Sequence, residues 1–379
     1  MIGILLYLLT TAFIPLWFYV VLFLWIYIFE RERYQYCMIK NKIFFNQIVL
    51  LMLLSCINFI IHVLFCGYIE IPQFIFIPII VYIAFSIKEN DINYIVPLIC
   101  LEGVVGLLEF SAEVTSFFPQ YLGSEDSFRS DEELLYFKRV AGLSAGVSSY
   151  GLKLLVGIVL CEFTSYSKRW KKEVLQVFLI ICLIMSFHRT SLVAGFIFII
   201  WKCYFECKRN KNMPIFYGGC LLALVFAAYY IDINYLVEQF TRSTGQLELA
   251  GRDYIWNNAW DHILNHPMEG NGSFRFRMSY HGVTAHCHNS FIQMIANNGM
   301  IIGSFYLWIM LHKLNKSNFI YAFPLLLSSM SQYFLFNGCS FQDIIYVMIL
   351  FKDDIFLKQK VGFTTNRSIV NFVQYGSIK

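Results

Sequence analysis

The residues best suited to chemistry in this chain are arginines and histidines that lie in polar stretches between hydrophobic segments. Arg252, Arg275 and Arg277 fall in one long polar segment that ends in His286-Cys287-His288-Asn289. An arginine presents a planar fork that binds phosphate through two hydrogen bonds and keeps its charge. A nearby histidine can move a proton at neutral pH. The combination predicts chemistry on a phosphate-linked substrate.

Two further arginines, Arg139 and Arg189, each lie at the mouth of an apolar segment. Arg139 precedes the small residues of 141–146, which allow helices to approach closely. Arg189 lies between two apolar runs, where a charge needs a partner. Any of the five arginines could instead be a snorkelling or solvated surface charge. We expect them to bind a pyrophosphate if the fold brings them together, which the sequence does not show.

His288 is the residue that we predict to act as a general base. It enters the next apolar segment with Asn289 beside it, and Asn289 could orient the imidazole or a sugar. The alternatives are a simple sugar contact and a zinc site built from His281, His286, Cys287 and His288. Their spacing fits no tight zinc template, and no second ligand pair is placed to complete one, so we predict no metal.

The composition is that of a membrane protein. Hydrophobic residues make up 58% of the 379 residues and charged residues only 14%, against roughly 25% in soluble domains. We therefore predict an all-α polytopic integral membrane protein with about 11 transmembrane helices. The candidate spans are about 3–29, 43–66, 72–87, 94–112, 141–163, 174–188, 190–205, 214–231, 290–311, 318–336 and 342–351, the last too short to span by itself.

Lysine and arginine are unevenly divided between the two sets of loops, and the richer set is predicted to be cytoplasmic. The opposite set holds one lysine and seven arginines. We predict one transmembrane domain over 1–351, with periplasmic loops at about 113–140 and 232–289, and a cytoplasmic tail over 352–379. If 3–29 is a single span, the N-terminus starts outside.

The sequence also predicts local structure around the candidate site. Apolar residues at helical spacing predict a short amphipathic helix over 252–265, and alternation over 274–281 predicts an extended segment with one basic face. Within the spans, Glu102 and Lys153 lie at similar depth and predict a buried pair that locks the helices, with a proton relay as the alternative. Glu109 is closer to the outer surface and could face the site.

At these residues the chain resembles the superfamily of O-antigen polymerases and O-antigen ligases, integral-membrane glycosyltransferases of bacterial surface polysaccharide assembly. The resemblance covers about 139–310. It is carried by Arg139-x-x-Gly142, Arg189-Thr190, Arg252-x-x-x-Trp256, His266-Pro267-x-x-Gly270-x-Gly272, and His288-Asn289 ahead of a segment with Gly299 and Gly303. The family's Asn-Pro-Asn soon after the first arginine is missing here, and His188 stands where serine often precedes the second.

The resemblance implies a helical fold of the GT-C type in the bacterial inner membrane, with a periplasmic active site. It implies an undecaprenyl-pyrophosphate-linked oligosaccharide as donor, held by the arginines at 139, 189 and 252, and His288 as the residue that helps to activate the acceptor hydroxyl. The transfer would invert the anomeric centre with no metal or other cofactor. Membrane lipid, a chain-length regulator and a flippase are the expected partners, and nucleic acid is not.

Three functions are compatible with these features. We prefer a polymerase that joins oligosaccharide repeat units on the lipid carrier. A ligase that moves the glycan to lipid A core would use the same donor and site. A lipid-linked oligosaccharide flippase or other transporter would be expected to show repeated halves and charges lining several spans, and the sequence shows neither.

Overall fold

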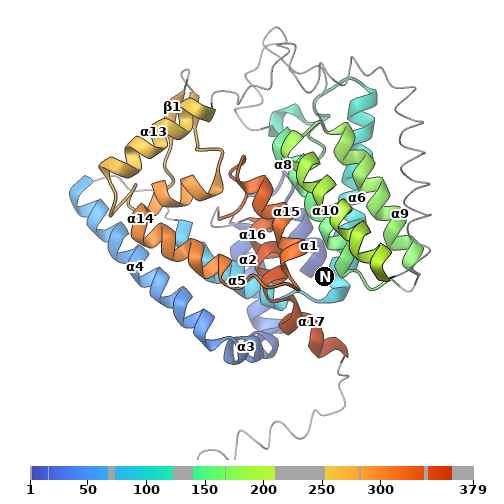
Figure 1. Cartoon of the computed structure of the whole chain (residues 1–379), viewed down its shortest axis with the longest axis horizontal. Helices are drawn as coiled ribbons and strands as arrows, with labels where there is room; N and C mark the ends of the chain where they lie inside the picture. Colours follow the sequence, from blue (N-terminus) through green and yellow to red (C-terminus); the bar gives the residue numbers. More distant parts are fainter. Residues whose placement is uncertain are drawn as a thin grey trace, which may run out of the picture.

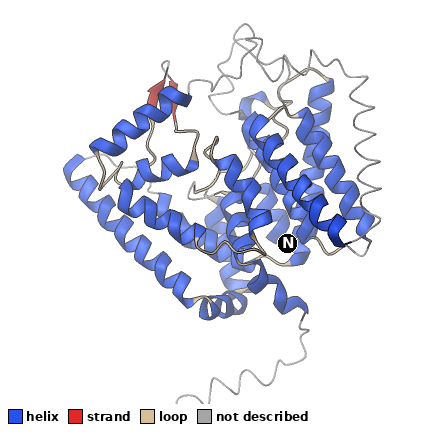
Figure 2. Cartoon of the chain, in the orientation of Figure 1, coloured by secondary structure: helices blue, strands red, loops and turns tan. Residues whose placement is uncertain are grey.

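The computed structural model describes residues 2–15, 17–66, 73–122, 140–166, 168–209, 252–280, 283–336 and 340–360. Across these residues the chain is mostly helical, and two short strands form one hairpin (Figure 2). The predicted helical class is therefore confirmed for this part of the chain. The predicted span at 214–231 lies outside it.

The helices are α1 (Ile2–Leu8), α2 (Phe18–Phe29), α3 (Arg31–Lys40), α4 (Lys42–Cys66), α5 (Ile77–Ser86), α6 (Glu89–Ser111), α8 (Val147–Leu160), α9 (Arg169–Met185), α10 (Arg189–Arg209), α13 (Arg252–Asn265), α14 (Ser290–Leu311), α15 (Phe319–Ser329), α16 (Phe341–Leu350) and α17 (Lys352–Lys360). Short 3-10 helices cover Gln73–Phe76, Pro119–Tyr121 and Cys161–Phe163, and the strands are β1 (Met278–Tyr280) and β2 (Val283–Ala285). In Figure 1, α4, α13 and α14 lie on one side, α6, α8, α9 and α10 on the other, and α16 between them.

The apolar character of the helices supports a membrane protein. Among the described residues, three segments are long and apolar enough to cross a bilayer: Lys42–Phe65, Glu89–Ser111 and Ser290–Leu311. Shorter apolar helices cover Phe18–Phe29, Phe74–Ser86, Phe319–Ser329 and Phe341–Leu350. Large side chains near the end of α4, such as Leu64 and Phe65, are exposed, as a lipid-facing surface requires. The predicted count of eleven spans is not confirmed.

The first apolar run is a helical hairpin and not a single span. The backbone N–H of Gly3, in α1, donates to Asp91 at 3.0 Å. Glu30, which follows α2, forms an ion pair with Lys88. Asp91 and Lys88 both lie at the start of α6, so the chain leaves this end through α1 and returns to it through α2. The expectation of one span over 3–29 is wrong, and the outside N-terminus loses its support.

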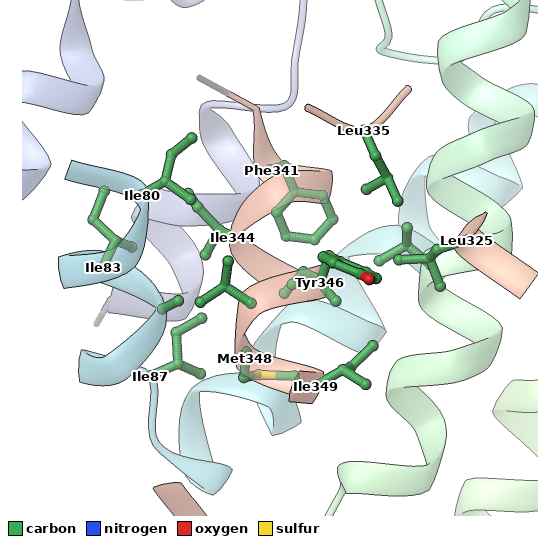
Figure 3. Packing of buried hydrophobic residues seen from close by; sticks show 14 of the residues in the cluster. Ile80, Ile83, Ile87, Leu325, Leu335, Phe341, Ile344, Tyr346, Met348 and Ile349 are labelled. Atoms are coloured by element: carbon green, nitrogen blue, oxygen red, sulfur yellow. The ribbon is translucent and has the colours of Figure 1, made fainter. Parts of the chain in front are cut away.

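The core is built around α16. This helix is apolar on all sides, so it is stable only when it is surrounded by other helices, and nearly all its residues are buried. Figure 3 shows Ile344 facing Ile83 of α5, with Leu325 of α15 on the opposite side. The hydroxyl of Tyr346 donates to the carbonyl of Met310 in α14 at 3.2 Å. A ten-residue segment that is too short to span thus forms the centre of the bundle.

The predicted contact between Glu102 and Lys153 is confirmed. The Lys153 ammonium lies 2.9 Å from Oε2 of Glu102, and the two side chains are 2% and 0% exposed. Lys153 also donates to the carbonyl of Thr10, while the carboxylate accepts from the hydroxyls of Tyr7 and Ser144. A buried ion pair is tolerated when further hydrogen bonds satisfy both groups. This network ties α1, α6 and α8 to the loop that follows Arg139.

Candidate functional site

Helix α13 has the predicted bounds, Arg252 to Asn265. Ile255, Ala259 and Ile263 are its buried residues and recur at the spacing of one helical face. This face packs on α14, and the helix begins at Arg252. From the same helix, the indole N–H of Trp256 donates to the carbonyl of Cys287 at 2.8 Å. Arg252 and Trp256 therefore lie on one rigid helix, and Trp256 connects this helix to the segment that carries the histidines.

The turn after α13 is docked into a kink of α14. Gly299 leaves helical geometry with φ 76°, and the freed N–H of Met300 donates to the carbonyl of Pro267 at 2.7 Å. A side chain at Gly270 would place its Cβ 2.3 Å from the nitrogen of Gly299, which no residue other than glycine permits. Gly270 and Gly299 therefore allow the two backbones to approach closely, and this contact fixes the position of α13 along α14.

The basic segment leads into the hairpin. β1 pairs with β2 antiparallel, with Met278 opposite Ala285, so the segment predicted to be extended is a strand over its last described residues. Arg275 and Arg277 lie just before β1, and the charges of both act on His286, which follows β2. The Arg275 guanidinium lies 5.4 Å from the ring centre of Tyr333, a cation–π distance. Arg277 is exposed.

Arg189 and Arg252, far apart in the sequence, are brought close together. Burial lowers the pKa of Arg252, and the positive charge of Arg189 lowers it further, although both guanidinium groups remain charged at neutral pH. Arg189 is the first residue of α10, and its Nε and Nη2 atoms are shielded from solvent. The preceding His188 is buried, and its Nδ1 accepts from the backbone N–H of Ser191 at 3.4 Å, so it caps the helix where the family often has serine.

Two histidine rings meet beside the arginines. The rings of His286 and His288 lie edge to face, 4.2 Å between centres, and Tyr333 approaches His286 at 5.4 Å. Burial lowers the pKa of His286 to about 4, and the charges of Arg275, Arg277 and Arg252 act in the same direction. His286 is therefore a neutral imidazole at physiological pH.

His288 lies in a strained turn at the start of α14. Its φ is 48°, a left-handed conformation that residues other than glycine adopt at a cost. The next residue, Asn289, is the N-cap of α14, and its Oδ1 accepts from the N–H groups of Phe291 and Ile292. The Asn289 side-chain N–H donates to the carbonyl of Met330 at 2.8 Å. Asn289 thus has a structural role that the sequence did not reveal, and its contact with substrate stays a prediction.

Arg139 lies outside the described residues, but carboxylates of α6 bind the loop that follows it. The two carboxylate oxygens of Glu109 accept from the backbone N–H groups of Phe117, at 2.9 Å, and Gly142, at 2.8 Å. Glu109 therefore ties together the two described ends of the loop that is predicted to be periplasmic. Glu102 accepts from the N–H of Leu143 in the same loop. The predicted part of Arg139 in the site stays a prediction.

The fold brings together five of the seven residues that we selected from the sequence: Arg189, Arg252, Arg275, Arg277 and His288. Tyr333 was missed, because it comes from a distant segment and no pattern marks it. The described residues contain no group of three or more His, Cys, Asp or Glu side chains that could hold a metal ion. His281, which the zinc alternative also used, is not among them, so that alternative is still to be tested.

One family model matches the chain. The model described as Wzy_C, O-Antigen ligase, matches residues 174–307. The chain is similar to this family over residues 174–307. This supports the predicted O-antigen ligase and polymerase superfamily. No curated protein and no solved structure matches the chain.

The Wzy_C segment runs from α9 to near the end of α14, so it contains the five arginine and histidine residues that the structure brings together. Members of this family are membrane glycosyltransferase-like enzymes of lipopolysaccharide biosynthesis. Tyr333 and the loop that follows Arg139 lie outside the matched residues. The site therefore combines the Wzy_C segment with elements on both sides of it.

Proposed function

We propose that the chain is an O-antigen polymerase of the bacterial inner membrane, which joins oligosaccharide units carried on undecaprenyl pyrophosphate at the periplasmic face. The observation that supports this most directly is the convergence of Arg189 with Arg252 beside His286. These two half-buried like charges repel each other. Such an arrangement is favourable when a ligand with several negative charges lies between them.

The arginines would act on the leaving group. The acceptor hydroxyl oxygen attacks the anomeric carbon from the opposite side, and the bond from that carbon to the pyrophosphate oxygen breaks with its electron pair on the pyrophosphate. Arg189 and Arg252 stabilise this developing charge from fixed positions, which is worth more in a partly desolvated site than in water. Of the four arginines that the structure describes at the site, Arg277 is the exposed one and is suited to a distal phosphate or a sugar.

His288 would take the proton of the acceptor hydroxyl. Since His286 beside it is neutral, its ring places no positive charge next to His288. A positioned base contributes typically 10²–10⁴-fold to such a step. The strain at His288 is consistent with a side chain whose direction is set by function.

An O-antigen ligase is the second candidate, and the printed description of the family model favours it. The donor and the chemistry are the same, and only the acceptor differs. Gene disruption followed by separation of the glycans on a gel distinguishes the two. Loss of the ladder with one attached unit retained means polymerase, whereas loss of every attached unit means ligase. An unchanged glycan profile would contradict both.

The site itself is tested by substitution. We expect Arg189→Ala and Arg252→Ala to abolish chain extension while the protein stays in the membrane, and lysine at either position to restore little, since it lacks the planar fork. Arg31→Ala is the matched control, because Arg31 lies in α3 and contacts the ring of Tyr27. Full activity of both alanine variants would refute the pyrophosphate clamp.

A further inference from the structure

Two carboxamides on one face of α14 are buried beneath the site. Gln293 is 0% exposed and Asn297 is 2% exposed, one helical turn apart. A buried carboxamide is costly unless its groups are hydrogen-bonded. The Gln293 side-chain N–H donates to Oδ1 of Asn297 at 2.8 Å, which fixes the orientation of both groups.

Three further side-chain hydrogen bonds of this pair go to two backbone segments. Oε1 of Gln293 accepts from the N–H of Cys287 at 2.7 Å, and its Nε2 donates to the carbonyl of Phe276 at 2.7 Å. Oδ1 of Asn297 accepts from the N–H of Phe276 at 2.7 Å. One glutamine side chain thus bridges two segments that are not paired to each other at these residues.

The two bridged residues are flanked by the residues of the site. Phe276 lies between Arg275 and Arg277, and Cys287 lies between His286 and His288. Both polar backbone groups of Phe276 are held by the carboxamides, and those of Cys287 are held by Gln293 and Trp256. When a peptide is fixed in this way, the directions of the side chains before and after it are fixed as well.

We propose that Gln293, supported by Asn297, is a positioning residue that sets the arginine segment against the histidine segment. The inference rests on the proposed function for its effect on the reaction, but the positioning itself is a property of the fold. Gln293 does not touch the reacting atoms. It acts through the peptides of Phe276 and Cys287, and its loss therefore affects both phosphate binding and proton transfer.

Cys287 provides a readout that does not depend on the reaction. Its side chain is 0% exposed, and burial raises the pKa of its thiol to about 12, so it reacts slowly with thiol reagents. If Gln293 holds this segment, Gln293→Leu releases it and exposes the thiol. Labelling by a maleimide can be measured for the Cys287 peptide by mass spectrometry of the full-length protein in detergent.

Gln176→Leu is the matched control. Gln176 is also a buried glutamine, 5% exposed, and its Nε2 donates to the carbonyl of Ile158 at 3.1 Å, but it lies in α9 and contacts Glu162 and Lys202. In Gln293→Leu we expect Cys287 to be labelled at least tenfold faster and the rate of chain extension to fall on the order of 100-fold. We expect Gln176→Leu to change neither by more than about twofold.

Gln293→Glu tests the donor and remains informative if the leucine variant does not fold. Its carboxylate can accept from Cys287 but cannot donate to Phe276, whereas the protonated acid can do both. The ratio of variant to wild-type activity is therefore expected to rise as the pH is lowered. A ratio that does not change with pH, or unchanged labelling of Cys287 in Gln293→Leu, overturns the proposal. The two proposals can fail separately. If Cys287 is labelled faster in Gln293→Leu but the wild-type protein transfers no glycan, the positioning role stands and the proposed function is contradicted.

Discussion

Acid is predicted to destabilise this protein through His286, and His286→Gln should remove the effect. The pKa of His286 is about 4 in the folded protein, against an ordinary value of 6.5. Below pH 6.5 the unfolded chain binds a proton at this position while the folded chain does not. The free energy of unfolding therefore falls as the pH decreases, until the folded imidazole is itself protonated near pH 4.

The size of the effect follows from the width of this window. One pH unit corresponds to about 1.4 kcal/mol for one proton, so the stabilisation lost between the two pKa values is about 3 kcal/mol. Burial accounts for most of the shift, and the charges of Arg275, Arg277 and Arg252 add to it. Gln at 286 carries no titrating group and should give a shallower dependence on pH.

Thermal unfolding of the purified protein in detergent between pH 7 and pH 4 measures this. The midpoint of the wild type should fall more steeply with acid than that of His286→Gln, and the two curves should separate between pH 6.5 and pH 4. His312→Gln, at an exposed histidine after α14, should follow the wild type. Parallel curves for wild type and His286→Gln would show that the imidazole is not held neutral, and the arrangement of arginines around it would have to be redrawn.

Three further outcomes are expected. Lys153→Met leaves the Glu102 carboxylate buried without its cation and should cost about 3 kcal/mol, seen as a lower unfolding midpoint, while adding Glu102→Gln should recover part of it; no recovery would contradict a paired lock. His288→Gly should relieve the positive φ and stabilise the fold by about 1 kcal/mol while abolishing chain extension, and a variant that is less stable would argue against strain. A reporter active only in the periplasm, fused near Gly245, should be active, and a silent fusion at normal expression would invert the predicted topology.

The features that the sequence predicted correctly either are local or follow from the high energetic cost of an unpaired charge within a span. Helix α13 was predicted with its bounds because the periodicity of its apolar residues is a local property. Glu102 and Lys153 were paired correctly because a charge within a span has few alternatives to an opposite charge at the same depth. The strand near Met278 was predicted for the same reason as the helix.

The features that were missed depend on contacts between distant segments. The segment that forms the hairpin of α1 and α2 has no charged residue, so the sequence predicted one continuous span. Tyr333 reaches the site from the connection after α15, and Gln293 looks like any polar residue near the end of a span. The contacts of Tyr333 and Gln293 depend on the tertiary fold, which places distant segments of the chain beside them.

The kink of α14 decides where the site lies relative to the rest of this apolar helix. Gly299 interrupts the helix, so Ser290 to Leu311 is not one straight rod. The part after the kink, from Met300 to Leu311, measures roughly 18 Å at 1.5 Å per residue, against the roughly 30 Å of a hydrocarbon core. The part before the kink begins next to His288, so the angle at Gly299 sets the depth of the reacting groups together with the length of the helix. A substitution that straightened α14 would therefore move His288 relative to a membrane surface, and would act on catalysis through position as well as on stability.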